Sequence, residues 1–451
     1  MALTVNSTDF NNSCNDYSVN FKNTAASTPV SSIPVQKEFE LSRFTPAHLI
    51  RFNTQLNSAE KEQYNTIVRL LATAKPEELH TLPEDTISMP KKLDALLKNG
   101  KLLDKNSNNS SSTLENLYKI ATTPRTDEIS NVTLLSETVS ALYNPAIITQ
   151  QFGDISPGVK NVIANNPEAP QEVKVNPDLL DVASSGTCVA ASIEFNLANK
   201  KPAEFARWVE GLSSAQGSIA QKVKLSSLSS NLMDAVWLLN AFELRPKEFN
   251  FNNVLLEIKP DKNAYVRVKN QAVNWDPGER SMVDVLMQST FMQLGSQQSY
   301  DTLTDIRAGN FNSSPQGLIE FEKTFVESVL ADKEKFSVVY QDVSPEQKLI
   351  GYRTGFETIE RHIKDAINSG EDVIVGYVLT NPLNEIETGH EITIVDYKTD
   401  KNGKTVFTCN DTDDGKRELI EYSAEYLIPK IHHAGYSEHV VRNDRHLLEV
   451  A

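Results

Sequence analysis

Helical and strand patterns are segregated along this chain. Apolar residues recur at helical spacing between about residues 36 and 145, whereas the strongest strand patterns lie beyond residue 370. A chain that alternates strands and helices builds a parallel sheet, but helices followed by strands indicate an α+β protein. We therefore predict an α+β fold, and we find no internal repeat.

Composition divides the chain into four regions. Residues 1–35 are rich in Asn, Ser and Thr and poor in large apolar residues, which predicts a disordered polar tail. Residues 36–150 carry the helical periodicity and are expected to form a helical accessory region. A stretch with several prolines and glycines over 151–180 is expected to be a linker. The main domain is then expected over 181–451, where the strand signals lie.

Several elements can be placed on the sequence. One helix is expected to begin at Cys188 and another near Pro202, because proline is accepted in the first turn of a helix. Further helices are expected over 93–97, 114–120, 132–143, 282–294 and 317–330. Strands are expected over 254–258, 264–268 and 372–379, and a hairpin over 392–397 and 405–409 around the turn signal Asn402-Gly403.

Charge and hydropathy exclude some partners. The chain has 44 Lys and Arg against 60 Asp and Glu, a formal net charge of −16, and nucleic-acid binding requires clustered basic residues instead. No apolar run approaches the roughly 20 residues that a membrane span needs. No apolar segment of a secretory signal follows the N-terminus. We therefore expect no nucleic-acid partner, no membrane insertion, and a protein that is cytoplasmic or exported without a Sec-type signal peptide. The sequence carries no signal of oligomeric state.

Three cysteines occur, which is too few for a disulfide framework. Cys14 lies in the polar tail and Cys409 ends an expected strand. Cys188 follows a Gly-Thr turn and opens an apolar helix. A thiol at a helix N-terminus meets the positive end of the helix dipole, which lowers its pKa and favours the nucleophilic thiolate. The alternative is a buried structural cysteine in a helix cap.

A histidine near the end of the chain could serve such a thiol. His390 follows glycine at the start of an expected strand, where the sheet would hold it rigidly enough to act as a base. The next strand returns antiparallel and brings Asn410 and Asp411 near His390, where either could orient the imidazole. Taken alone, His390 could be an ordinary hydrogen-bonded loop histidine, and Asn410 and Asp411 could belong to a turn rich in Asx side chains.

These segments resemble the papain-like cysteine peptidases, calpains included. The resemblance rests on Gly-Thr-Cys-Val-Ala-Ala-Ser at 186–192, Gly-His-Glu-Ile-Thr-Ile-Val-Asp-Tyr at 389–397, and the Asn at 410. It implies a papain-like catalytic domain over 181–451, made of a helical half and an antiparallel sheet half. It also implies that Cys188 is the nucleophile, that His390 is the base, and that Asn410 or Asp411 is the orienting residue.

The chain departs from the family pattern at two places. The family usually has an oxyanion-hole glutamine a few residues before the cysteine, where this chain has Val-Ala-Ser at 182–184. Gln150 and Gln151 could supply that side chain if residues 152–183 loop out. The segment 412–415 also lacks the aromatic residue that often follows the family's Asn, which leaves the third catalytic residue open.

The resemblance implies a cysteine peptidase that hydrolyses peptide or amide bonds through an acyl-enzyme, with a protein or peptide as substrate. The alternatives are acyl transfer or deamidation of the transglutaminase type, and a catalytically inactive binding module. No cofactor and no metal are expected. His432, His433 and His439 could suggest a metal, but we expect them in a surface loop or as satisfied core residues.

Overall fold

A computed structural model describes residues 31–33, 55–126, 129–151, 157–165, 167, 171–177, 186–224, 241–242, 254–307, 317–413 and 417–448. Its α-helices are α1 (Ser58–Thr73), α2 (Met89–Lys98), α3 (Thr113–Thr122), α4 (Asn131–Tyr143), α5 (Pro157–Ala164), α6 (Gln171–Val175), α7 (Cys188–Lys200), α8 (Pro202–Leu212), α10 (Ala264–Asn274), α11 (Met282–Gly295), α12 (Glu320–Ala331), α13 (Phe356–Asn368), α14 (Ala424–Leu427) and α15 (Glu438–Val441). Its strands are β1 (Ser31–Ile33), β2 (Ile219–Val223), β3 (Val254–Ile258), β4 (Lys335–Val339), β5 (Gln341–Val343), β6 (Leu349–Tyr352), β7 (Val373–Thr380), β8 (Ile386–Thr399), β9 (Thr405–Asn410), β10 (Leu419–Ser423) and β11 (Ile431–Ser437).

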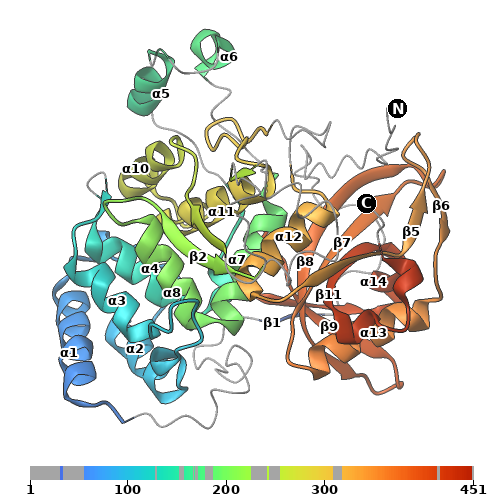
Figure 1. Ribbon diagram of the computed structural model, residues 1–451, viewed down its shortest axis with the longest axis horizontal. Helices are drawn as coiled ribbons and strands as arrows, with labels where there is room; N and C mark the ends of the chain where they lie inside the picture. Colours follow the sequence, from blue (N-terminus) through green and yellow to red (C-terminus); the bar gives the residue numbers. More distant parts are fainter. Residues whose placement is uncertain are drawn as a thin grey trace.

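The main sheet has seven strands in the order β1-β10-β9-β8-β7-β11-β4, and every pairing within it is antiparallel. Two short two-stranded sheets, β2–β3 and β5–β6, accompany it. Figure 1 shows the early helices gathered on one side and the main sheet on the other. The predicted α+β class is confirmed as a mixture of helices and antiparallel sheet, and the predicted hairpin is the β8–β9 pair.

The early helices share a core with the middle of the chain. Helices α1 to α4 pack on one another, and α3 and α4 also contact α8. One buried apolar cluster joins Leu117 of α3, Leu134 of α4, Cys188 of α7 and Trp208 of α8. The region expected over 36–150 is helical where it is described, and its core continues into α7 and α8.

The main sheet is covered on both faces. Side chains along a strand alternate between faces, and on β7 Ile374 belongs to the cluster of the early helices, whereas Val373 and Val375 belong to a second cluster that includes Ile363 of α13. Helix α12 packs on β4 and β11, and α7 contacts β7 and β8. Helix α7 therefore lies between the helical part and the sheet (Figure 1). Its first residue, Cys188, lines one pocket together with His390 of β8.

The strand expected over 264–268 is wrong, because these residues begin helix α10. The β-branched and aromatic residues of Tyr-Val-Arg-Val favour a strand locally. In the structure Ala264, Val268 and Gln271, spaced as on one helix face, are all fully buried. Tertiary packing of this face outweighs the local preference.

The tail and the linker are each partly described. Within the expected disordered tail, residues 31–33 instead form β1, which pairs with β10; backbone pairing of this kind leaves no mark on composition. The rest of the tail, including Cys14, lies outside the described residues. The expected linker contains α5 and α6. Among the helices described, none is long and apolar enough to cross a membrane.

Candidate active site

The turn that precedes Cys188 is held from two directions. The Gly186 N–H donates to Asp305 Oδ2 at 2.5 Å, and the Thr187 hydroxyl donates to Gln288 Oε1 at 3.2 Å. The first helical hydrogen bond of α7 runs from Ala191 N–H to the Thr187 carbonyl at 2.8 Å. Cys188 is thus the first residue of the helix, as predicted, and its side chain is 2% exposed.

The position of Cys188 has two chemical consequences. The first backbone N–H groups of a helix have no acceptor within the helix, and they can stabilise a negative charge beside them. The helix dipole favours a thiolate at the same place. The Cys188 sulfur is disulfide-bonded in this structure, so any chemistry of its thiolate belongs to the reduced protein.

His390 is oriented by a carboxylate. It lies on β8, and its Nε2 is 2.7 Å from Asp411 Oδ1, directly after β9. The Tyr377 ring on β7 and the imidazole pack in a T-shaped arrangement, with 5.8 Å between ring centroids and an interplanar angle of 81°. Because Asp411 holds Nε2, the other ring nitrogen, Nδ1, is left to exchange a proton with a thiol.

The surroundings of His390 favour its protonated form. Burial alone would lower the pKa of the imidazole, but the charge and the hydrogen bond of Asp411, with further contributions from Asp413 and Glu391, raise it to about 9. At neutral pH the ring is then an imidazolium, which stabilises a thiolate close to it.

Cys188 and His390 line the same pocket. It is small and partly open to solvent. Its walls come from the start of α7, from β7, β8 and β11, and from Gly317 and Leu318 before α12. The two residues that the sequence selected 202 positions apart are thus brought to one cavity.

The structure separates the two candidates for the third residue. Asp411 contacts His390, whereas the buried Asn410 amide makes no hydrogen bond with any residue in the described part of the chain. Asn410 is the last residue of β9, and Asp411 is the first residue beyond it. Asp411 therefore holds the orienting position, and the assignment to Asn410 has no geometric support.

The two candidate oxyanion glutamines lie beside the Asp411 loop. Gln150 is buried, its Oε1 accepts from the Thr412 hydroxyl at 3.0 Å, and its N–H donates to the Thr412 carbonyl at 3.1 Å. Gln151 Nε2 donates to Asp413 Oδ1. Neither glutamine lines the pocket, so both brace the loop after β9, and the backbone of α7 is left as the donor that the geometry offers.

Gln288 is a supporting residue that the sequence did not reveal. This buried side chain of α11 accepts from Thr187, and its Nε2 donates to the Thr149 carbonyl at 2.8 Å and to Glu194 Oε2 at 3.0 Å. It ties the turn before Cys188 to α7 and to the segment that carries Gln150. One glutamine in an apolar helix gives no sequence signal, because its partners are distant in the chain.

Comparisons with protein-family models, with curated proteins and with solved structures gave no match to this chain.

Proposed function

We propose that this protein is a papain-like cysteine hydrolase that cleaves peptide or other amide bonds. The observation that carries the proposal is the shared pocket of Cys188 and His390, in which the imidazole is oriented by Asp411 through Nε2. The same three roles, nucleophile, base and orienter, define catalytic triads on unrelated folds.

The reaction would start from the reduced thiol. The Cys188 thiolate, paired with the His390 imidazolium, attacks the substrate carbonyl carbon, forming a C–S bond while the carbonyl oxygen becomes an oxyanion. Backbone N–H groups at the start of α7 are placed to stabilise that charge. When the C–N bond breaks, the imidazolium returns its proton to the leaving nitrogen.

The second half of the reaction frees the enzyme. Water gives one proton to His390 Nδ1 as its oxygen attacks the thioester carbon. The C–S bond then breaks, an acid product leaves, and the Cys188 thiolate and His390 imidazolium are restored. No redox partner enters either half. An amine in place of water would instead give acyl transfer, which is the alternative chemistry for the same three side chains.

The test is labelling by a vinyl-sulfone electrophile, with the modified residue identified by mass spectrometry, after treatment with a reductant. We expect Cys188 to be labelled in the wild type and labelling to fall at least about 100-fold in His390→Ala, because general acid–base groups contribute about 10²–10⁴-fold. Without reductant, Cys188 is expected to stay unlabelled, because its sulfur is disulfide-bonded.

Two controls accompany this experiment. His439→Ala removes an exposed histidine of α15 and should leave labelling unchanged. Cys409 is fully buried, with a pKa raised by burial and then by the nearby Asp411 and Glu421, and it should stay unlabelled in the same sample. Equal labelling of Cys188 in wild type and His390→Ala would refute the proposed pair.

A further inference from the structure

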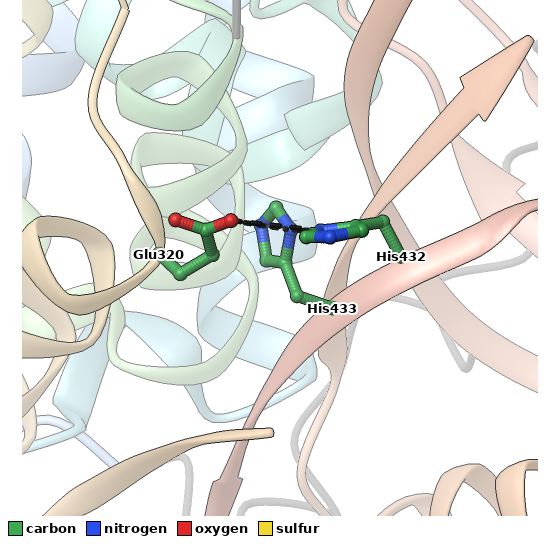
Figure 2. A group of neighbouring side chains, drawn as sticks. All are labelled: Glu320, His432 and His433. Carbon is green, nitrogen blue, oxygen red and sulfur yellow. Dashed lines mark hydrogen bonds and ion pairs between the residues drawn. The ribbon is translucent and has the colours of Figure 1, made fainter. Parts of the chain in front are cut away.

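A second group of ionisable side chains lies in the wall of the same pocket. Glu320 is the first residue of α12, and His432 and His433 are on β11; all three are buried. Figure 2 shows the Glu320 carboxylate directed at the two imidazole rings. The sequence predicts these histidines in a surface loop or as satisfied core residues, and the structure places both in a buried strand.

A β-bulge brings the two histidines together. Consecutive residues of a regular strand point to opposite faces, so neighbouring histidines would normally diverge. The pairing of β11 with β7 shifts register between Ile431 and His433, which makes His432 the extra residue. Bulges of this kind redirect side chains and are frequent beside functional sites. His432 Nδ1 and His433 Nδ1 thereby come within 3.0 Å of each other.

The three donor atoms have the spacing of metal ligands. Glu320 Oε1 is 3.5 Å from His432 Nδ1 and 3.8 Å from His433 Nδ1, and the two nitrogens are 3.0 Å apart. Ligands about 2.0–2.1 Å from a tetrahedral Zn²⁺ lie about 3.3–3.4 Å from one another. One ion can therefore contact all three atoms with small adjustments.

The second nitrogen of His433 is already fixed. His433 Nε2 is 2.6 Å from Glu391 Oε1 on β8, and Glu391 Oε2 is 3.1 Å from Lys323 Nζ on α12. A carboxylate that holds the far nitrogen of a ligating histidine is the usual outer partner in zinc sites, where it sets the tautomer and the ring orientation. Here it would leave the Nδ1 lone pair of His433 directed at His432 and Glu320.

The carboxylate of Glu320 favours the binding of a cation. Glu320 is 5% exposed, and among the residues described its ion-pair contacts are the two imidazoles alone, at 3.5 and 3.8 Å. A buried carboxylate is costly unless a cation or strong hydrogen-bond donors accompany it. Lys323 is engaged by Glu391.

The absence of a side chain on Gly376, a glycine of β7, provides space for this group. A Cβ built on Gly376 of β7 would lie 2.6 Å from Glu391 Oε1 and closer still to His433 Cε1. Only glycine at this position lets β7 pass beneath the Glu391–His433 pair. The bulge, the glycine and the outer carboxylate are three separate features that favour the same ligand geometry.

We propose that Glu320, His432 and His433 bind one zinc-type transition-metal ion, with a fourth position open to the pocket that contains Cys188 and His390. Two imidazoles and one carboxylate suit Zn²⁺ and its neighbours, whereas Mg²⁺ and Ca²⁺ prefer oxygen ligands alone. Sites with three protein ligands and one open position are the catalytic type of zinc site. This ion would join α12 to β11 and would accept a water or a substrate oxygen from the pocket.

The test is calorimetric titration of the metal-free full chain with ZnCl₂, in a Cys14→Ser, Cys188→Ser background so that neither thiol can bind the ion. We expect one Zn²⁺ per chain. Glu320→Gln and His432→Asn should each weaken binding at least about 100-fold, and Glu391→Gln about 10–100-fold, as for other outer partners. His439→Ala, which removes an exposed histidine, should not change the affinity.

A second readout separates this site from adventitious binding. Co²⁺ in the tetrahedral site should give the intense visible bands of four-coordinate cobalt, and these bands should disappear in Glu320→Gln; circular dichroism would show whether each variant is folded. No stoichiometric binding, or equal affinity in wild type and both ligand variants, would overturn the proposed site. Because the background lacks Cys188, the outcome is independent of the proposed hydrolase.

Discussion

At the scale of single residues, the choice between Asn410 and Asp411 determines the charge of His390. A carboxylate beside an imidazole raises its pKa, whereas a neutral amide only orients the ring. The sequence placed both residues near His390 but could not choose between them, because adjacent residues at a strand end point in different directions. The choice depends on β9 ending at Asn410, which frees Asp411 to turn toward His390.

Asp411→Asn should lower the pKa of His390. In a Cys188→Ser background, titration of the His390 ring by NMR of ¹⁵N-histidine-labelled protein should give a midpoint of about 9. Loss of a neighbouring charge shifts a pKa by about 1–3 units, so the midpoint in Asp411→Asn should fall by that amount. Asn410→Ala is the matched control and should leave the midpoint in place; a drop there as large as in Asp411→Asn would contradict the assignment.

The same pair should make stability depend on pH. The pKa of His390 is about 9 in the folded protein and about 6.5 when unfolded, so the pair contributes fully below about pH 6.5 and its contribution is lost as pH rises through 9. The melting temperature of the wild type should therefore fall more between pH 6.5 and 9.5 than that of Asp411→Asn. Parallel curves for the two proteins in calorimetry would argue against a charged pair.

Site residues could be predicted from the sequence where a short segment of the chain determines their position. Cys188 opens a helix after a Gly-Thr turn and His390 follows glycine on a strand, so both could be proposed from short segments. Gln288 and Glu320 could not. The partners Glu194, Thr187 and Thr149 lie 94, 101 and 139 residues from Gln288, and the two histidines lie at least 112 residues from Glu320. The pairing of His432 with His433 depends on a bulge, and a bulge is defined by the neighbouring strand.

At the scale of elements, the pairing of β7 with β8 positions the side chains of the site, and Gly376 of β7 leaves room for them. Strands β7 and β8 pair so that Gly376 faces Glu391 and Tyr377 faces His390. His390 and Glu391 are adjacent residues of β8. The Asp411–His390 pair and the Glu391–His433 pair therefore lie next to each other along this strand. The strand over 372–379 was predicted correctly as a buried apolar run, and the strands over 392–397 and 405–409 as a hairpin around Asn402-Gly403. In contrast, the start of α10 was predicted as a strand from its β-branched residues.

Gly376→Ala should destabilise the protein by about 1–3 kcal/mol, because an added methyl group meets the buried Glu391–His433 pair. Urea denaturation followed by circular dichroism would measure the change. Gly351→Ala on β6 is the matched control, since its Cβ would meet only Asp342 Oδ2, at 4.0 Å. Equal stability of Gly376→Ala and wild type would mean that the pair moves freely, and the rigid zinc geometry would lose its support.

At the scale of the whole molecule, the early helices and the sheet are physically continuous. The sequence suggested a separate accessory region because its composition changes after residue 150, but composition does not show which faces pack together. The cluster that contains Leu117 of α3 also contains Ile374 of β7 and Leu419 of β10. A substitution that destabilises the early helices should therefore also destabilise the main sheet.

Leu117→Ala should lower the free energy of unfolding by about 2–5 kcal/mol, because Leu117 is fully buried. The reaction of Cys409 with a thiol reagent reports on unfolding of the sheet. In this variant we expect its midpoint urea concentration to fall to the same value as the midpoint of the helical signal in circular dichroism. Leu255→Ala removes an exposed leucine and should change neither midpoint. Helical unfolding that precedes Cys409 exposure would show that the early helices unfold independently.

Strand β1 covers the edge of the main sheet that β10 would otherwise expose. Its three residues pair with Glu421, Ile420 and Leu419, so β10 is an interior strand along that length. An uncovered edge strand presents unsatisfied N–H and C=O groups that can template a strand from another chain. Cleavage that removed residues 31–33 would turn β10 into such an edge, and shortened forms of the protein would be prone to associate with one another through it.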